Sequence, residues 1–380
     1  MAFTICKLIE NLAPRHDISL VSFVRSEEEK QQVKQLLPYC RRVETVLIPQ
    51  GIGRKLWTRT KMLTLTPLAF SQGYCAEMRD KIRSMTAEQK YDVVQMDYTM
   101  GQYVSEISGS ATVIYLLDLI YEKARTLSSH LPFSRKKLEW LADSFLCRRY
   151  ERKLYTQFDL VLAISEKIKQ SLLACNPALD ISVLPTGVDI PRAPKRSHDA
   201  KGRNIVFMGA MWRPENVDAV TYFYRSVFGR IRDAIPDVTL HIVGGSPAEE
   251  IKQLASDPSV HVTGYVEDLP SFYTQCDVSI APIRMAGGVH CKILDAMASG
   301  LPVITTTGGN EGIGAIPDKE IIIADDAGTF ARRTIELLED EALRNTIGTA
   351  GLVFVQRNFG WKPIIARLEA SYQRCLSSRV

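Results

Sequence analysis

The sequence lacks the features that would place it in several large classes of protein. It has no apolar run long enough to cross a membrane, and its start has neither the basic residues nor the long apolar centre of a signal peptide. A formal net charge of +4 over 380 residues is too small for a protein that binds nucleic acid through a strongly basic face. The eight cysteines show no CxxC pair and no zinc spacing. We therefore expect a cytoplasmic protein with reduced, mostly buried thiols.

Several catalytic motifs are also absent. No DxD pair is present to hold a Mg²⁺–diphosphate, and neither GxxxxGK[ST] nor GxGxxG occurs, so a P-loop is excluded and a dinucleotide site is disfavoured. HExxH and GxSxG are missing, and none of the six histidines has the context of a catalytic triad. We expect His241 and His261 to be structural because they lie in or beside predicted strands.

What is present describes a globular α/β protein. The sequence is 46% hydrophobic and 24% charged, and its length favours two domains. Apolar runs alternate with helical patterns, which predicts parallel sheets with right-handed crossovers. The predicted strands are 18–24, 43–48, 92–96, 112–117, 160–164, 181–184, 204–208, 239–243, 260–262, 278–280, 302–306 and 320–324. The clearest helical patterns are 27–37, 216–234, 248–254 and 327–338.

A polar, basic segment at residues 189–203 contains Pro and Gly and has little apolar periodicity, so it is interpreted as a linker between two domains. We expect the domains to enclose a cleft, because doubly wound sheets bind ligands beyond the carboxyl ends of their strands.

The segment from Arg284 to Gly314 carries the strongest functional signal. Gly287 and Gly288 precede a helix that contains Lys292 and Asp295. Free N–H groups and the positive end of the helix dipole suit a phosphate, to which a lysine adds positive charge. The carboxylate would accept hydrogen bonds from the two hydroxyls of a ribose. The alternative interpretation is an ordinary turn followed by a surface Lys–Asp pair.

Other glycine-containing loops follow predicted strands of the second half. Gly209 and Arg213 follow the first of these strands, Gly244 ends the second, and Tyr265 and Val266 follow the third. Such loops form walls of ligand sites, and Arg213 is placed to meet a phosphate, although simple turns are the alternative.

Residues 122–153 have no strand signal and contain nine Lys or Arg against four Asp or Glu, interleaved with apolar residues. A basic amphipathic helix of this kind lies on an anionic membrane surface or, as is slightly more common, packs on its own domain with the charges facing solvent.

Several ordered blocks of the chain resemble glycosyltransferase family 4, the group 1 retaining enzymes of the GT-B fold, and among them the bacterial exopolysaccharide sugar transferases. The resemblance covers roughly residues 148–380. The blocks are RRYERKLYTQFDLVLAISE, VLPTGVDI, FMGAMWRPENVDAVTYF, IPDVTLHIVGGSP, VHVTGYVEDL and CDVSIAPIRMAGGVHCKILDAMASGLPVITTTGGNEGI.

The resemblance implies two Rossmann-like, doubly wound parallel-sheet domains facing a cleft. Residues 1–190 would bind the acceptor, with a helix at about 362–380 packing back on them. Residues 191–361 would bind a nucleotide-diphospho-sugar. The donor-binding residues that the resemblance implies in this second domain are Gly209, Met211, Arg213, Gly244, Tyr265, Val266, Gly287, Gly288, Val289, His290, Lys292 and Asp295.

The resemblance also implies roles for particular residues. Asp295 falls on the glutamate that holds the ribose, and Lys292 and Arg213 meet the diphosphate and are the catalytic candidates of this domain. Such enzymes need no metal and no cofactor, because the nucleotide sugar is a co-substrate. The first domain lacks the histidine that many relatives use, and Asp118, with Glu122 nearby, is the candidate in its place.

The chain departs from the family in three places. Gly287 stands where many relatives have a glutamate, and Asp295 is one methylene shorter than the usual residue. The third departure is at the start, where relatives have a strand and a glycine-rich loop before the first helix, whereas this sequence begins at the helix. Since that strand is central in the sheet, we expect a gap or rearrangement in the first sheet, as from a missed start codon or a truncation.

The sequence thus predicts a retaining glycosyltransferase of surface polysaccharide or glycoconjugate synthesis, cytoplasmic and peripheral on the inner face of the plasma membrane. Its acceptor would be a glycan or a lipid-linked sugar. The alternatives are a non-catalytic nucleotide-sugar-binding protein and a GT-B epimerase.

Overall fold

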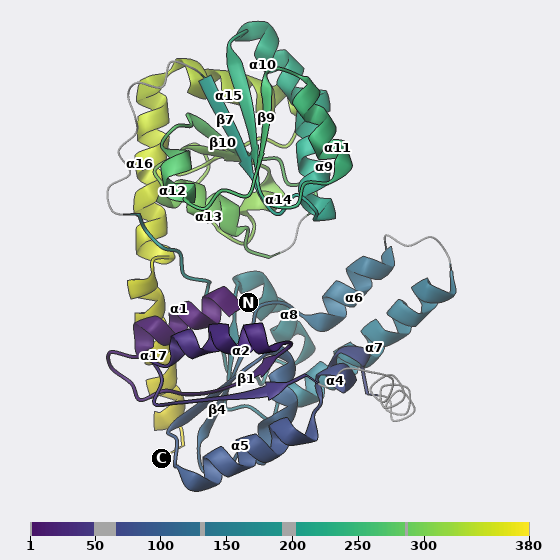
Figure 1. Ribbon diagram of the computed structural model, residues 1–380, viewed down its shortest axis with the longest axis vertical. Coiled ribbons are helices and arrows are strands. Elements are labelled where there is room, and N and C mark those ends of the chain that lie inside the picture. Colours follow the sequence, from purple (N-terminus) through teal and green to yellow (C-terminus); the bar gives the residue numbers. More distant parts are fainter. Residues whose placement is uncertain (1, 49–65, 130–133, 192–202, 286–287, 380) are drawn as a thin grey trace. The chain divides into compact units, whose positions relative to one another are not determined.

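The computed structural model describes residues 2–48, 66–129, 134–191, 203–285 and 288–379. They form two units, each with parallel strands and surrounding helices (Figure 1). Unit 1 comprises Met1–Pro185 and Ile365–Val380, and unit 2 comprises Thr186–Ile364. Most of the predicted linker, residues 192–202, lies outside the described residues.

Unit 2 contains a six-stranded parallel sheet in the order β12-β11-β10-β7-β8-β9. The strands are β7 (Arg203–Met208), β8 (Val238–Val243), β9 (Val260–Gly264), β10 (Val278–Ala281), β11 (Val303–Thr305) and β12 (Ile322–Ile323). The first and fourth strands of the unit, β7 and β10, are neighbours. The chain therefore moves outward in opposite directions from them, which is the topological switch point at which such sheets bind ligands.

Helices cover both faces of this sheet. They are α9 (Pro214–Tyr222), which continues through a π-helical segment η3 (Phe223–Phe228) into α10 (Gly229–Ala234), then α11 (Glu249–Gln253), η4 (Leu254–Ser256), α12 (Leu269–Tyr273), α13 (Cys291–Ala298), α14 (Thr307–Asn310), α15 (Ala327–Glu339) and α16 (Glu341–Asn358).

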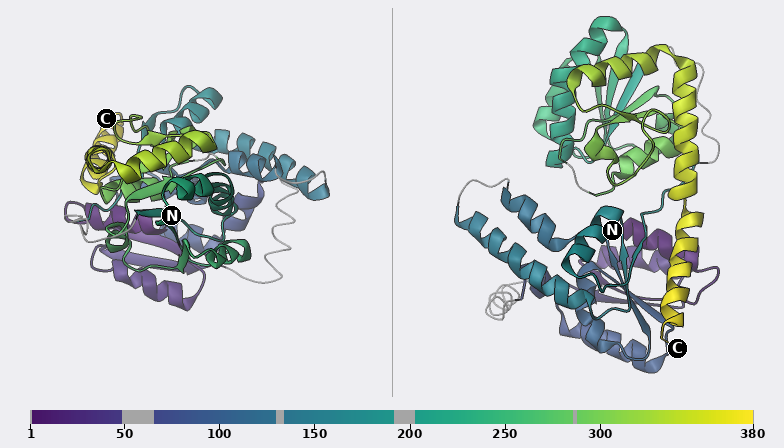
Figure 2. Two further views of the ribbon diagram at one scale, coloured as in Figure 1. Left: turned by 90° about the horizontal axis from the view of Figure 1, so that it is seen from above. Right: turned by 180° about the vertical axis from the view of Figure 1, so that it is seen from behind.

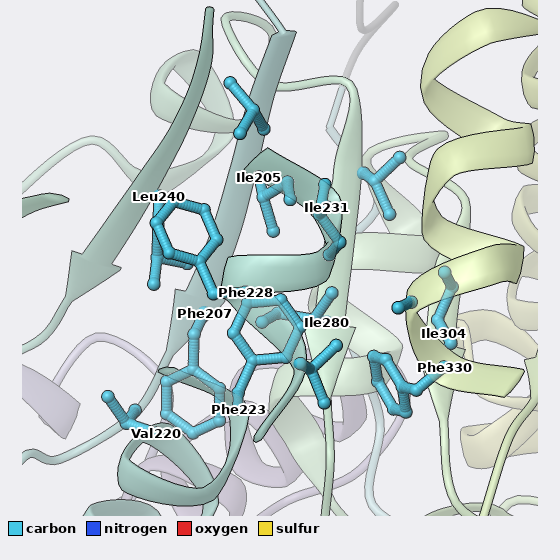
Figure 3. Close-up of a cluster of buried hydrophobic side chains, with 14 of the residues drawn as sticks. Ile205, Phe207, Val220, Phe223, Phe228, Ile231, Leu240, Ile280, Ile304 and Phe330 are labelled. Carbon is cyan, nitrogen blue, oxygen red and sulfur yellow. The ribbon is translucent and has the colours of Figure 1, made fainter. Parts of the chain in front are cut away.

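Alternating strand residues supply two cores in unit 2. Ile205 and Phe207 of β7 face the core that contains Phe223, Phe228 and Phe330 (Figure 3). Between them, Val206 points to the other face, where it joins a second core with side chains of α13. A strand with apolar residues on both faces is the pattern of a buried parallel sheet.

Unit 1 has two separate parallel sheets. Strand β1 (Ser19–Val24) pairs with β2 (Arg42–Leu47), whereas β3 (Val93–Asp97), β4 (Ala111–Leu116), β5 (Leu160–Ala163) and β6 (Ile181–Val183) form a sheet in that order. Residues 2–12 form helix α1 (Ala2–Leu12) rather than a strand. Within the described residues, β1 and β3 each pair on one side only. The first sheet is therefore divided, as the sequence predicted.

The remaining helices surround these sheets. They are α2 (Glu27–Val33), η1 (Lys34–Leu36), α4 (Leu68–Gly73), α5 (Ala76–Glu88), η2 (Tyr98–Glu106), α6 (Ile120–Ser129), α7 (Arg135–Tyr155), α8 (Glu166–Cys175) and α17 (Trp361–Ser377). The last of these fastens the end of the chain to unit 1, since Tyr372 donates a hydrogen bond to Gln95 of β3 at 2.6 Å. Among the described residues, no helix combines the length and apolarity needed to span a membrane.

Candidate functional site

The loops after β7, β8 and β9 approach one another closely at the carboxyl edge of the unit 2 sheet. The N–H of Gly209 donates to the carbonyl of Val243 at 3.0 Å, and that of Gly244 donates to Gly264 at 2.8 Å. Gly244 has a φ of 151°, and a Cβ there would lie 1.7 Å from the carbonyl oxygen of Gly209. Only glycine fits this position, so the sequence fixes how near these loops come to each other.

Lys292, in the first turn of α13, is held at the switch point by two groups, Asn216 and the ring of Phe207. Its ammonium donates a short hydrogen bond to Asn216 Oδ1, and Asn216 in turn donates to the carbonyl of Ala210 at 2.9 Å. The Lys292 Nζ also lies 4.5 Å from the centre of the Phe207 ring. Gly209 leaves room for this arrangement, because a Cβ there would lie 3.0 Å from Nζ and closer still to Asn216.

Burial lowers the pKa of Lys292 to about 8, with Glu215 acting to raise it and Arg213 to lower it. The lysine is therefore a cation held partly out of water, where a diphosphate would replace the missing solvation. No acidic side chain of the described residues forms an ion pair with Lys292, so its charge is available to a ligand.

His290, at the start of α13, has a buried Nε2 without a hydrogen-bond partner among the described residues. Burial, with a smaller effect of Lys292, lowers the pKa of His290 to about 4, so the ring is neutral at pH 7. A neutral imidazole nitrogen beside Lys292 either donates to or accepts from a ligand, according to its tautomer.

Asp295 lies one turn after Lys292 on the same helix. Burial raises its pKa to about 7, and the nearby carboxylate of Asp189 contributes in the same direction. A carboxylate kept in this environment gains from accepting hydrogen bonds, which the paired hydroxyls of a ribose would supply.

Arg213 is the N-cap residue of α9 and is largely exposed. Its guanidinium pairs with Glu215 at 3.3 Å and lies 5.6 Å from the ring of Trp212. The structure thus places Arg213 close enough to Lys292 to affect its pKa, while leaving its side chain accessible.

The other donor-binding candidates divide into three groups. Met211 is fully buried in the core, so it positions the loop after β7 rather than presenting a polar group. Tyr265 is 79% exposed just after β9, whereas Val266 packs against the second core. In the loop before α13, Gly288 has a φ of 70°, and Val289 packs against the second core, while Gly287 lies outside the described residues.

A second polar cluster lies at the carboxyl edge of the four-stranded sheet in unit 1. Asp118 follows β4 and accepts a hydrogen bond from the N–H of Leu119 at 2.8 Å. Next to it in space, the buried Glu151 accepts from the N–H groups of Ile120 and Tyr121, both at 3.1 Å, at the start of α6. Burial raises the pKa of Glu151 to about 7, with its hydrogen bonds opposing the shift. Glu122 accepts from the Tyr121 hydroxyl and lies in the first turn of the same helix.

Sequence reasoning missed Asp97 and Tyr98 in this cluster. Asp97 ends β3, its Oδ1 is buried without a partner among the described residues, and burial raises its pKa to about 6. Tyr98 has a φ of 48°, which is a strained conformation for a bulky residue and is typical of functional sites. The available signal was the position itself, since polar residues directly after a parallel strand lie at the ligand-binding edge.

Among the described residues, no three His, Cys, Asp or Glu side chains are grouped so that they could hold a metal ion. Independence from metals stays a prediction.

The comparison with solved structures identifies the fold. The crystal structure of HepE from Anabaena, in complex with UDP and glucose, is similar to this chain with a TM-score of 0.64 and 15% identity, over 98% of this chain and 95% of that chain. The fold is the GT-B fold of glycosyltransferases.

Sequence comparisons give the family. Residues 202–340 match the sequence model described as glycosyl transferases group 1. An uncharacterized 44.6 kDa protein in the cps region of Klebsiella pneumoniae is 22% identical over 370 residues, which cover 93% of this chain and 90% of that protein. The capsular polysaccharide biosynthesis glycosyltransferase CapM of Staphylococcus aureus is 25% identical over 239 residues, and the aligned part covers 57% of this chain and 62% of that protein. The match of residues 202–340 to the group 1 glycosyltransferase model agrees with the resemblance seen in the sequence.

Proposed function

We propose that this protein transfers a hexose, with retention of anomeric configuration and without a metal, from a nucleotide-diphospho-sugar to a glycan or lipid-linked acceptor. The observation that carries the proposal is the half-buried Lys292 ammonium at the switch point of unit 2, one helical turn before the half-buried carboxylate of Asp295. The order of the two side chains along the helix matches the order of the ligand groups, because the cation would bind the diphosphate and the carboxylate would accept hydrogen bonds from the adjoining ribose. The similarity to HepE, whose structure contains UDP and glucose, and to a capsular polysaccharide enzyme supports this choice of substrates.

In the proposed donor complex, Lys292 and Arg213 bind the diphosphate together with the N-terminus of α13. His290 contacts the same phosphates or the sugar through its unpartnered Nε2. Asp295 accepts from the ribose, and the exposed ring of Tyr265 with Val266 flanks the base. Gly209 and Gly244 allow the backbone to approach the ligand closely.

The proposed reaction is a front-face displacement. The bond between the anomeric carbon and the phosphate oxygen breaks, and the acceptor oxygen bonds to the same face of that carbon. The acceptor proton passes to the leaving diphosphate oxygen. Lys292 and Arg213 stabilise the negative charge that develops on the diphosphate, so little help from a protein base is needed. Asp118 orients the acceptor hydroxyl in unit 1. No cofactor takes part.

Incubation of the full chain with UDP- and GDP-sugars and with glycan or lipid-linked acceptors tests the proposal. We expect release of the nucleoside diphosphate together with a glycoside that has the anomeric configuration of the donor, as seen by NMR, and no loss of rate in EDTA. Product of inverted configuration or a rate abolished by EDTA would contradict the mechanism.

A second candidate is a protein that binds nucleotide sugars without transferring them. Asp295 favours it, because its side chain is one methylene shorter than the glutamate expected at this position from the resemblance. Tight donor binding without turnover on any acceptor would support this candidate. Conversion of the donor sugar into another nucleotide sugar would instead indicate an epimerase.

A further inference from the structure

Helix α7 presents large apolar side chains to solvent. Leu138, Leu141 and Phe145 are 52%, 43% and 69% exposed. Their spacing of three and four residues places them in a row on one side of the helix. Single exposed apolar residues are ordinary on a protein surface, but a row of three on one helix is a continuous apolar surface.

This row does not face the domain. The opposite side of α7 packs into unit 1 through the buried residues Cys147, Leu154 and Tyr155, and Glu151 on that side caps α6. Figures 1 and 2 show α6 and α7 extending side by side from the sheets of unit 1. A helix that is merely solvated would turn its apolar residues inward and its charges outward. Helix α7 thus packs on its own domain with its arginines outward, but the exposed apolar row needs a further explanation.

Positively charged side chains follow the exposed apolar row on the same side of α7. Arg148, Arg149 and Arg152 follow Phe145 at the same helical spacing and are exposed. Arg148 contacts the Tyr121 ring and Cys175. Within the described residues, neither Arg149 nor Arg152 forms an ion pair.

The neighbouring acidic side chains do not cancel this charge. Glu139 is paired with Arg135 at 3.0 Å, and Asp143 accepts from the N–H of Leu68. One face of α7, defined here as the α7 face, thus combines three large apolar side chains with three arginines over about 20 Å of helix.

We propose that the α7 face docks on an anionic lipid bilayer. Leu138, Leu141 and Phe145 enter the boundary between headgroups and acyl chains, while Arg148, Arg149 and Arg152 bind lipid phosphates. The charge pattern favours this occupant, because a row of arginines with no acidic side chain among them matches a plane of negative charge. The inference is independent of the proposed sugar chemistry.

Flotation of the full chain with vesicles tests the proposal. Vesicles of phosphatidylcholine with about one third phosphatidylglycerol should carry the protein at low salt, and binding should weaken as salt is raised. Vesicles of phosphatidylcholine alone should bind at least tenfold less. Equal binding to both kinds of vesicle, or no binding to either, would overturn the proposal.

Variants identify the surface. Phe145→Ser should weaken binding about tenfold or more, and the double variant Arg149→Gln, Arg152→Gln about 25-fold, at roughly fivefold for each arginine. Leu37→Ser is the matched control, because Leu37 is 53% exposed elsewhere in unit 1. It should bind like the wild type.

Thermal melting checks that each variant is folded. Loss of binding in Leu37→Ser equal to that in Phe145→Ser would refute the assignment. A wild-type dimer that Phe145→Ser abolishes, without vesicle binding by either protein, would assign the α7 face to a second copy of the chain instead.

Discussion

Replacement of Lys292 by methionine should separate donor binding from stability. Methionine keeps an unbranched side chain beside the Phe207 ring. It removes the ammonium group that donates a hydrogen bond to Asn216 Oδ1. A hydrogen bond to a charged group contributes about 1.5–3 kcal/mol, so the affinity for a nucleoside diphosphate should fall about 10- to 150-fold. If the charge on the diphosphate increases in the transition state, kcat should fall further, by about 100-fold or more.

The same substitution should not destabilise the fold. A Lys292 pKa lowered from 10.5 to about 8 means that the charged form is held in the folded protein at a cost of roughly 3 kcal/mol. Methionine removes this cost, although it leaves Asn216 Oδ1 without its donor. We expect a melting temperature equal to or above that of the wild type.

Isothermal titration with a nucleoside diphosphate and with the matching nucleoside provides the assay. The nucleoside lacks phosphates, so its weaker binding should be unchanged by the substitution. Lys252→Met, at an exposed lysine paired with Glu249, is the matched control. Diphosphate affinity within threefold of the wild type, in a folded Lys292→Met variant, would refute the role of this residue.

Three further predictions concern other parts of the two clusters. Diphosphate affinity should be highest between pH 7 and 8. As the pH rises above the Lys292 pKa of about 8, the lysine loses its charge and binding should weaken by up to tenfold per pH unit. As the pH falls below the Asp295 pKa of about 7, the carboxylate becomes protonated and accepts hydrogen bonds from the ribose less well. Titrations from pH 5.5 to 9.5 should show this, and Lys292→Arg should remove the alkaline limb; an unchanged limb would contradict the assignment. Gly244→Ala should lower the melting temperature by roughly 2–12 °C, since its Cβ would meet the Gly209 carbonyl and its φ is strained for alanine. A melting temperature within 1 °C or so of the wild type would show that the loops move apart easily. Asp118→Asn, which keeps the acceptor for the Leu119 N–H, should lower kcat about 100-fold with unchanged donor affinity; full turnover would exclude Asp118 from the reaction.

The strands were predictable because buried parallel strands leave a strong local signal. Short apolar runs such as residues 204–208 and 278–280, bounded by turn residues, lie within two residues of β7 and β10 as observed. The divided first sheet was expected from the family resemblance, because relatives have a strand before the first helix, whereas residues 2–12 of this chain form α1. The one irregularity that local pattern did not show is the π-helical segment Phe223–Phe228 within the predicted helix 216–234.

The candidate donor site was partly predictable for a similar reason. Glycines, a lysine and an aspartate within one short segment have fixed spacing on a helix, so Lys292 and Asp295 could be placed on one side from sequence. The partner of Lys292, Asn216, lies 76 residues earlier in the chain. No local pattern links two such residues, because strand order in the sheet brings α9 and α13 together.

By itself, the sequence determined the α/β class, the strands and the position of the candidate donor segment, since each depends on neighbours in the chain. Tertiary structure decided which groups lose their water. It buried Asp97 Oδ1 without a hydrogen-bond partner among the described residues and left Phe145 exposed, although sequence alone shows only a polar residue at the end of a strand and an apolar residue in a helix. Both outcomes depend on what packs against each side chain, and the packing partners come from distant parts of the chain.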